Sequence, residues 1–127
     1  MPYQSTTQGD TMANNYQQVT RDISAALAEI RKEVPDVLKG FNGMAQAASR
    51  EGVLSHKNKE LIAMAIAITA RCEGCLGYHA QTLVKLGVTR QEFMEMLGVA
   101  VYMGGGPSLM TAAEALMAFE EFAETKK

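Results

Sequence analysis

The only two cysteines of this 127-residue chain share a short segment with one of its two histidines. Cys72, Cys75 and His79 follow the spacing C-x-x-C-x-x-x-H. On a helix, these offsets place the three side chains on one face. Two thiols beside an imidazole could form a redox dithiol, they could supply part of a metal site, or the three residues could simply share a helix face. All three interpretations are open at this point.

The redox interpretation depends on how a thiol is activated. Cys72 is expected to begin a helix, where unpaired backbone N–H groups and the helix dipole favour an anion, so a thiolate should form there readily. His79 lies one turn after Cys75 and is placed to accept the proton of that thiol, directly or through one water. The two arguments therefore favour different cysteines as the nucleophile.

A zinc site is the second interpretation. Cys72, Cys75 and His79 supply three ligands, and His56 or Glu60 could complete a tetrahedron. The sequence has no second C-x-x-C and no H-x-x-x-H to accompany them. A c-type haem site is not expected, because it requires a histidine directly after the second cysteine.

Composition narrows the class of protein and its partners. With 47% hydrophobic and 20% charged residues, the chain is typical of one globular domain. A formal net charge of -2 without a basic cluster argues against nucleic acid and anionic membranes as partners. The longest apolar run, residues 61–70, is too short to span a bilayer. The N-terminal residues lack the features of a secretory signal, so we expect a cytoplasmic location, where a close cysteine pair is more often catalytic or metal-binding than structural.

Helical periodicity describes most of the chain. Residues 1–13 are polar and are expected to form a flexible tail, followed by one all-α domain over residues 14–127. The apolar spacing predicts about six helices with a central antiparallel pair. Ser55 is expected to cap the third helix, and Gly87 to end the fourth. Thr89 and Glu92 then form a capping box for the fifth.

Three of these helices have a clear apolar face that we expect to be buried. The second helix, which begins at Pro35, should bury Val37, Leu38, Phe41, Met44 and Ala48. The fifth should bury Phe93, Leu97, Ala100 and Val101, and the sixth Leu109, Ala113, Leu116, Phe119 and Phe122.

A longer motif points to a known family. Glu60 stands twelve residues before Cys72, and C-x-x-C-x-x-x-H follows. This pattern resembles the signature of the alkylhydroperoxidase D-like branch of the carboxymuconolactone decarboxylase superfamily. The similarity covers roughly residues 35–123 and includes the turn at 102–107, which is similar to the Y-x-G-G-x-P of that family. The resemblance implies an all-helical, thiol-dependent redox enzyme.

The resemblance also implies a role for each residue of the motif. Cys75 would be the attacking thiolate, with His79 as its proton acceptor. Glu60 would be a further member of the proton relay, and Cys72 the resolving thiol that closes the disulfide. The implied substrate is a hydroperoxide or a disulfide, with electrons returned by an external dithiol and no tightly bound cofactor. Members of this size imply a homo-oligomer, a trimer or a hexamer.

The chain departs from the best-known hydroperoxidases at one position. They have a histidine immediately before the second cysteine, where this chain has Gly74, and this difference favours dithiol exchange over peroxide reduction. The decarboxylase branch lacks the cysteine pair, so lactone decarboxylation is not expected. A zinc-binding helical module and a redox-sensing oligomer stay open as alternative functions. His56 is expected at the surface, and Tyr78 is expected either to line a pocket or to fill a seam between helices.

Overall fold

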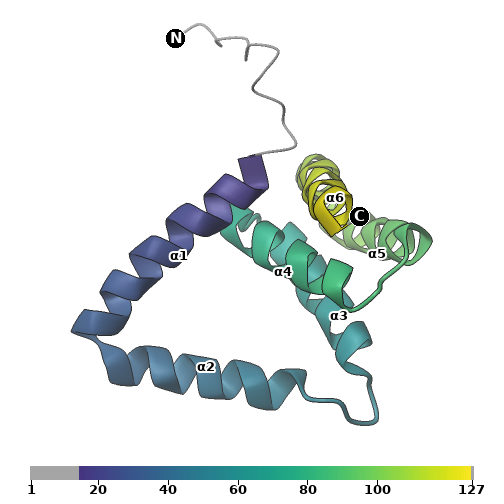
Figure 1. Cartoon of the computed structure of the whole chain (residues 1–127). Helices are drawn as coiled ribbons and strands as arrows, with labels where there is room; N and C mark the ends of the chain where they lie inside the picture. Colours follow the sequence, from purple (N-terminus) through teal and green to yellow (C-terminus); the bar gives the residue numbers. More distant parts are fainter. Residues whose placement is uncertain (1–14, 127) are drawn as a thin grey trace, which may run out of the picture.

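Six helices make up almost all of the part of the chain that the structure describes, residues 15–126 of a computed structural model (Figure 1). They are α1 (Asn15–Glu33), α2 (Pro35–Ser49), α3 (His56–Thr69), α4 (Glu73–Lys85), α5 (Arg90–Gly104) and α6 (Gly106–Lys126). The prediction of an all-α fold is confirmed, with no strand among residues 15–126. The expected tail at 1–13 lies outside the described residues. No helix within this range is long and apolar enough to cross a membrane.

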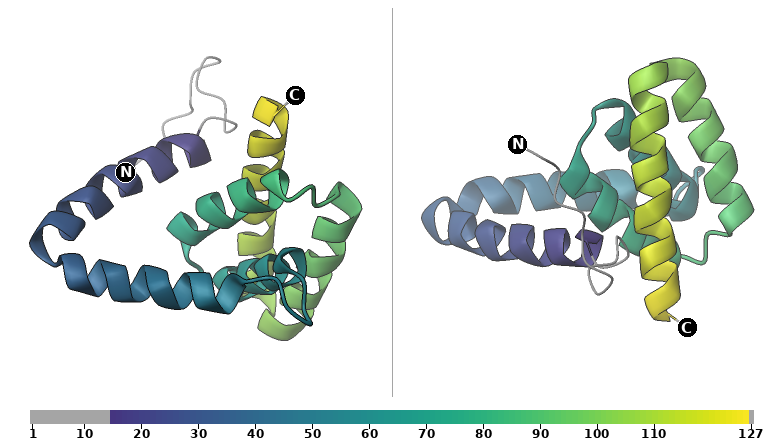
Figure 2. Two further views of the ribbon diagram at one scale, coloured as in Figure 1. Left: turned by 60° about the horizontal axis from the view of Figure 1, so that its bottom comes forward. Right: turned by 90° about the horizontal axis from the view of Figure 1, so that it is seen from above.

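The core of the protein lies among the last four helices. α4 packs against both α3 and α6, while α5 packs against α3 and α6. Figure 2 shows α5 and α6 side by side as a helical hairpin that flanks the α3–α4 pair. The largest fully buried side chains are Phe93, Met64, Ile68, Leu76 and Leu83. The rings of Phe93 and Phe119 stack at a centroid distance of 4.3 Å and join α5 to α6.

The predicted helix boundaries are confirmed by their hydrogen bonds. Ser55 Oγ accepts the backbone N–H of Asn58 at 3.0 Å, which caps α3. Thr89 and Glu92 form both hydrogen bonds of a capping box at the start of α5. The side chain of Lys57 donates to Glu92 at 2.7 Å and ties α3 to α5. This hydrogen bond, followed by the bond from the Thr89 backbone, lowers the pKa of the Glu92 carboxyl group.

A buried carboxylate on α6 holds the first turn of α1. Glu121 is 3% exposed. Its oxygens accept the backbone N–H groups of Tyr16 at 3.3 Å and Gln17 at 2.6 Å. These amides have no partner within their own helix, and the negative charge suits the positive end of the helix dipole. Burial, followed by the negative charge of Glu114 and other carboxylates, raises the pKa of Tyr16 to about 12. α1 is therefore anchored to the body at its N-terminal end.

Two glycines let α1 lie close to the helix that carries the cysteine motif. A Cβ atom on Gly77 would lie 2.5 Å from Cγ2 of Thr20, and one on Gly74 would lie 2.6 Å from Cδ1 of Ile23. Such distances are far shorter than a van der Waals contact, so a side chain at either position would require Thr20 or Ile23 to shift. The glycines of α4 therefore allow a close contact between α4 and α1.

The predicted inner face of α2 is not buried by this chain. α2 has no buried residue. The exposed fractions of Val37, Phe41 and Met44 are 65%, 60% and 63%. The prediction is wrong for the single chain because α2 contacts only α1 and α3, so that α1 and α2 form an arm that stands away from the core (Figure 1). Leu109 and Ala113 on α6, which were also expected to be buried, are exposed as well.

The anchor of α1 gives a first prediction. Glu121→Ala leaves two backbone N–H groups in a buried position without their acceptor, so the free energy of unfolding should fall by about 2 kcal/mol. Glu120→Ala is the matched control, since Glu120 is half-exposed and forms only a 3.7 Å ion pair with Arg90. Chemical denaturation of both variants measures the difference. Equal stability of the two variants would contradict the anchoring role.

Candidate redox site

The site begins with a tight reversal of the chain between α3 and α4. α3 ends in a Schellman motif, in which Cys72 N–H donates to the carbonyl of Ala67 at 3.0 Å and Arg71 N–H to that of Ile68 at 3.1 Å. Arg71 has a φ angle of 57°, a left-handed conformation that glycine usually adopts. The motif brings the chain from the end of α3 to the first residue of the cysteine motif in three residues.

The two cysteines are joined at the N-terminus of α4. Cys72 and Cys75 form a disulfide with their Cα atoms 5.2 Å apart. Cys72 is the N-cap residue, and its Sγ accepts the backbone N–H of Cys75 at 3.2 Å. On reduction, this position would place the Cys72 sulfur at the positive end of the helix dipole, where a thiolate is favoured. Both cysteines are partly exposed, so the bond is within reach of a reactant.

The structure brings Glu60 of α3 against His79 of α4. His79 Nδ1 lies 2.8 Å from Glu60 Oε2, and the Glu60 side chain is only 10% exposed. Because an ionised carboxylate only accepts hydrogen bonds, Nδ1 of the ring must carry the proton in this contact. The other ring nitrogen, Nε2, is then free to accept a proton in the neutral imidazole. A carboxylate that orients an imidazole in this way is the usual support of a general base.

The expected contact between the imidazole and the thiols is not formed in this state. Within residues 15–126, no hydrogen bond joins His79 to either sulfur. The sulfurs are bonded to each other, so neither carries a proton that the ring could accept. The structure thus brings Glu60 and His79 together, and Cys72 and Cys75 together, as two neighbouring pairs on α3 and α4.

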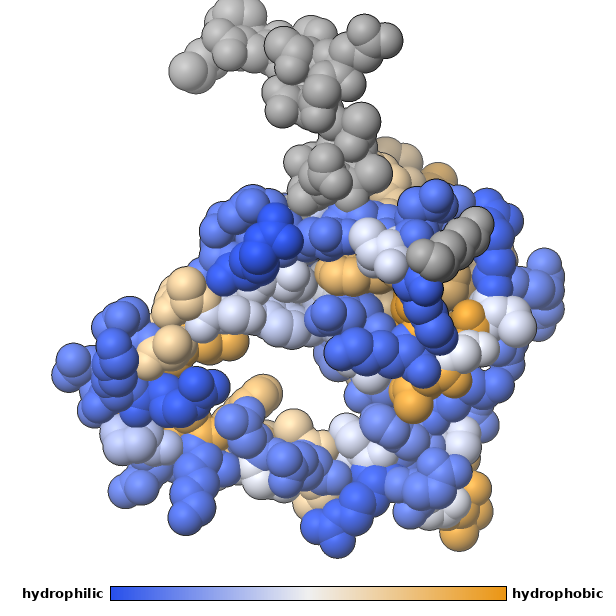
Figure 3. All heavy atoms as spheres, viewed as in Figure 1, coloured by the Kyte–Doolittle hydropathy of each residue, from blue (hydrophilic) through white to orange (hydrophobic). Residues whose placement is uncertain are grey.

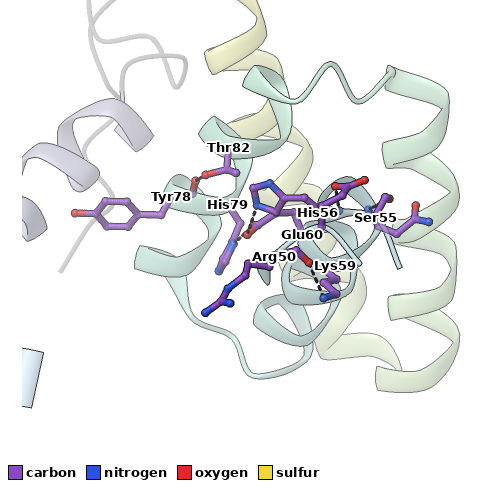
Figure 4. A network of polar contacts seen from close by, with 10 residues as sticks. Arg50, Ser55, His56, Lys59, Glu60, Tyr78, His79 and Thr82 are labelled. Atoms are coloured by element: carbon purple, nitrogen blue, oxygen red, sulfur yellow. Dashed lines mark hydrogen bonds and ion pairs between the residues drawn. The ribbon is translucent and has the colours of Figure 1, made fainter. Parts of the chain in front are cut away.

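A second histidine, which the sequence analysis placed at the surface, lies beside the same carboxylate. His56 Nε2 is 3.7 Å from Oε1 of Glu60, and the His56 side chain is 37% exposed. Figure 4 shows the Glu60 carboxylate between the two imidazoles. The sequence contained a signal for this arrangement: His56 and Glu60 are four residues apart on a predicted helix and must share a face.

A pocket of about 440 Å³ opens next to Glu60. It lies between α2, α3 and α4, and its lining residues are Ala45, Gln46, Ser49, Arg50, His56, Glu60 and Thr82. Tyr78 does not line it. The Tyr78 side chain points away from the Glu60–His79 pair toward α1 (Figure 4), where its hydroxyl donates to the carbonyl of Thr20 at 3.1 Å and also contacts Ser24. Of the two positions expected for Tyr78, the structure shows the one between two helices, α4 and α1.

The zinc site that the sequence allowed is not formed by these residues in the disulfide state. The described part of the chain contains no group of three or more His, Cys, Asp or Glu side chains arranged to hold a metal ion. In the disulfide state, Cys72 and Cys75 have no thiolate to offer as a ligand.

The chain has relatives among known proteins. The model of the carboxymuconolactone decarboxylase family matches residues 35–118. An uncharacterised protein of Cupriavidus necator is 33% identical over 109 residues, which cover 80% of this chain and 96% of that protein. The uncharacterised protein 4 in the cox locus of Paracoccus denitrificans is 30% identical over 98 residues, 77% of this chain and 88% of that protein.

A solved structure extends the comparison. The crystal structure of an apo carboxymuconolactone decarboxylase family protein from Legionella pneumophila is 58% identical in sequence and matches with a TM-score of 0.85. The match covers 87% of this chain and 98% of that one. The fold and the site define a class of protein: an all-helical domain with a C-x-x-C pair at the start of a helix. The chain belongs to the carboxymuconolactone decarboxylase family, and its cysteine pair is compatible with the C-x-x-C branch of the family.

The left-handed residue before Cys72 gives a second prediction. Arg71→Gly removes the Cβ atom that disfavours this conformation, so the free energy of unfolding should rise by about 1 kcal/mol. Arg71→Ala removes the same charge but keeps the Cβ atom, and should bring no such gain. Thermal unfolding of both variants, each in the disulfide form, makes the comparison. A gain in the alanine variant equal to that in the glycine variant would assign the effect to the charge instead of the backbone.

Proposed function

We propose that this protein is a thiol–disulfide oxidoreductase whose working group is the Cys72–Cys75 pair. The observation that carries the proposal is a disulfide at the start of α4, followed one turn after Cys75 by His79, which is hydrogen-bonded to Glu60 of α3. A short disulfide loop stabilises a fold little, because it closes few residues in the unfolded chain. A buried carboxylate that orients an imidazole is costly to maintain away from water, which supports a chemical role for the group.

In the oxidising direction, the reduced protein would transfer two electrons to a disulfide or a hydroperoxide. Cys75 would lose its proton to His79, and its thiolate would attack one sulfur of the substrate disulfide. An S–S bond to Cys75 forms, the substrate S–S bond breaks, and the leaving thiolate takes up a proton. Cys72 would then attack the mixed disulfide, which releases the second substrate thiol and closes the Cys72–Cys75 bond.

With a hydroperoxide, the balance is similar. The Cys75 thiolate attacks the outer oxygen, the O–O bond breaks, and the alcohol leaves with one proton. Attack of Cys72 on the resulting sulfenic acid closes the disulfide and releases water. An external dithiol then returns two electrons and two protons to the pair. We place this cycle in the cytoplasm, where thiols are kept reduced and such donors are available.

The packing of α1 favours a disulfide as the oxidant. Gly74 stands where the best-known hydroperoxidases have a histidine, and Cδ1 of Ile23 fills the space that a side chain at this position would need. The chain therefore offers no imidazole on that side of Cys75 to assist a departing alkoxide. A thiolate is a better leaving group than an alkoxide and needs less assistance.

Single cysteine variants test the proposal and the roles within it. Cys75→Ser should abolish turnover with a disulfide substrate and a dithiol donor. Cys72→Ser should react once and stop as a mixed disulfide, because no second thiol resolves it. Intact mass with alkylation of free thiols measures both, and in the wild-type protein the cycle should remove and restore both alkylation sites.

Three other results would change the role of the cysteines or favour another function. Reversed effects of the two variants would make Cys72 the nucleophile, as its N-cap position favours. A disulfide that forms without turnover would favour a redox sensor. Thiols that resist alkylation in the reduced protein, with a zinc-sized mass that a chelator removes, would favour a metal-binding module.

We propose further that a second copy of this chain covers α2. The exposed side chains of Val37, Phe41 and Met44 form a stripe with helical spacing. Figure 3 shows apolar surface on the rim of the opening that is bounded by α1, α2 and the rest of the molecule. On the other side of the molecule, α5 and α6 form a nearly apolar groove of about 490 Å³. One chain thus exposes two separate apolar surfaces. In a homo-oligomer with closed symmetry, neighbouring copies of the chain can cover both.

The assembly is testable by a charge at the centre of the stripe. Phe41→Asp should shift the protein from the expected trimer or hexamer toward the monomer, because an ionised carboxylate cannot be buried in an apolar contact at low cost. Asn42→Asp adds the same charge one residue away and should leave the assembly intact. Sedimentation velocity measures the mass of each. A wild-type monomer would overturn the proposal.

A further inference from the structure

We propose that His56 is a positioning residue that forms the solvent end of the proton relay, so that the relay runs from His79 through Glu60 to His56. This inference rests on the proposed function of the cysteine pair and adds a member that the C-x-x-C-x-x-x-H motif does not contain. Its role is to exchange protons between the buried carboxylate and the water of the neighbouring pocket, at a distance from the sulfurs.

The first observation is the geometry of the carboxylate. Glu60 offers a different oxygen to each ring: Oε2 is 2.8 Å from His79 Nδ1, and Oε1 is 3.7 Å from His56 Nε2. The first distance is a hydrogen bond. The second is longer than a hydrogen bond, and a small side-chain rotation or one water closes it. The two imidazoles come from different helices and converge on one acid (Figure 4).

The second observation is that a buried carboxylate lies between two partly exposed rings. The Glu60 side chain is 10% exposed, whereas those of His79 and His56 are 31% and 37% exposed. His56 and Glu60 also line the same pocket. A proton that reaches Glu60 from the His79 side therefore has His56 as its neighbour on the way to solvent.

The main chain holds His56 in place. Its backbone N–H donates to Oε2 of Glu51 at 2.8 Å, and the preceding residue, Ser55, caps the helix. Charged groups near the pocket are Arg50 in its wall and Lys59, whose Nζ donates to the Arg50 carbonyl at 2.7 Å. The His56 ring itself has no hydrogen bond within the described residues, so its other nitrogen is free to exchange with water.

The reaction leaves a proton on His79 that the ring must lose before the next cycle. When Cys75 ionises, its proton passes to His79. If the leaving group takes its own proton from water, His79 stays protonated and cannot serve as base in the next cycle. Transfer of the Nδ1 proton from His79 to Glu60, from Glu60 to His56 and from His56 to water returns the ring to its neutral form, and the proton given to solvent balances the one that the leaving group took. The proton that remains on Nε2 returns to Nδ1 through water, which the 31% exposure of the ring allows, and Nε2 can then accept a proton again.

Chemical rescue separates this role from a structural one. In His56→Ala, the rate of the thiol–disulfide cycle should fall by about tenfold. Added imidazole should restore most of it, because the pocket and the vacated side-chain volume can hold a free imidazole beside Glu60. Asn58→Ala, an exposed change in the same helical turn, should leave the rate unchanged. His79→Ala should lower the rate more strongly than His56→Ala.

The outcomes distinguish the inference from the proposed function. If His56→Ala retains the wild-type rate, or loses rate that imidazole does not restore, the relay does not pass through His56 and the inference is overturned while the redox cycle stands. If the wild-type protein does not cycle its thiols, the proposed function fails first, and the relay fails with it. The cysteines are intact in both histidine variants, so the final amount of disulfide should equal that of the wild type.

Discussion

The reversal between α3 and α4 is the constraint on which the site depends. Three residues separate the helices, and the Schellman motif needs a left-handed residue at Arg71 to close. This turn sets where α4 begins, so it makes Cys72 the N-cap. It also sets how α4 returns along α3, and hence which residues meet across the pair. Glu60 lies nine residues before the end of α3 at Thr69 and meets a residue in the second turn of α4. The carboxylate and the cysteine pair therefore belong to one geometric unit.

Local signals in the sequence predicted the elements well. Ser55, Thr89 and Glu92 act within a few residues of their own position, and short-range hydrogen bonds decide helix starts, so their patterns sufficed. The contact between Glu60 and His79 depends on the way two helices cross, which no local pattern records. His56 was missed although its spacing to Glu60 was visible, because a lone histidine near a helix start is usually solvated. The sequence also predicted that α2 has an apolar face, but an apolar face does not say which molecule covers it.

The contact between α1 and α4 involves the residue next to Cys75 and so connects the packing of the fold with the chemistry of the site. Gly77 and Gly74 lie on the face of α4 that α1 approaches, and Glu121 secures the same helix from α6. The position before the second cysteine therefore serves packing in this chain. A side chain at this position would require Ile23 to move aside. An exchange of glycine for histidine therefore affects the contact with α1 as well as the chemistry beside Cys75.

The pocket lies between α2, which carries the proposed assembly surface, and Glu60 of the candidate site. His56 and Glu60 line it from α3, on the face that continues into the core at Met64. Ala45, Gln46 and Ser49 form a wall on α2. α2 has no buried residue and is held by its two ends alone. Glu60 is therefore held by a packed helix, whereas the wall on α2 has few contacts with the rest of the chain. If a second copy covers the stripe, association also fixes the wall of the pocket, so the volume available beside Glu60 becomes a property of the assembly and not of the single chain.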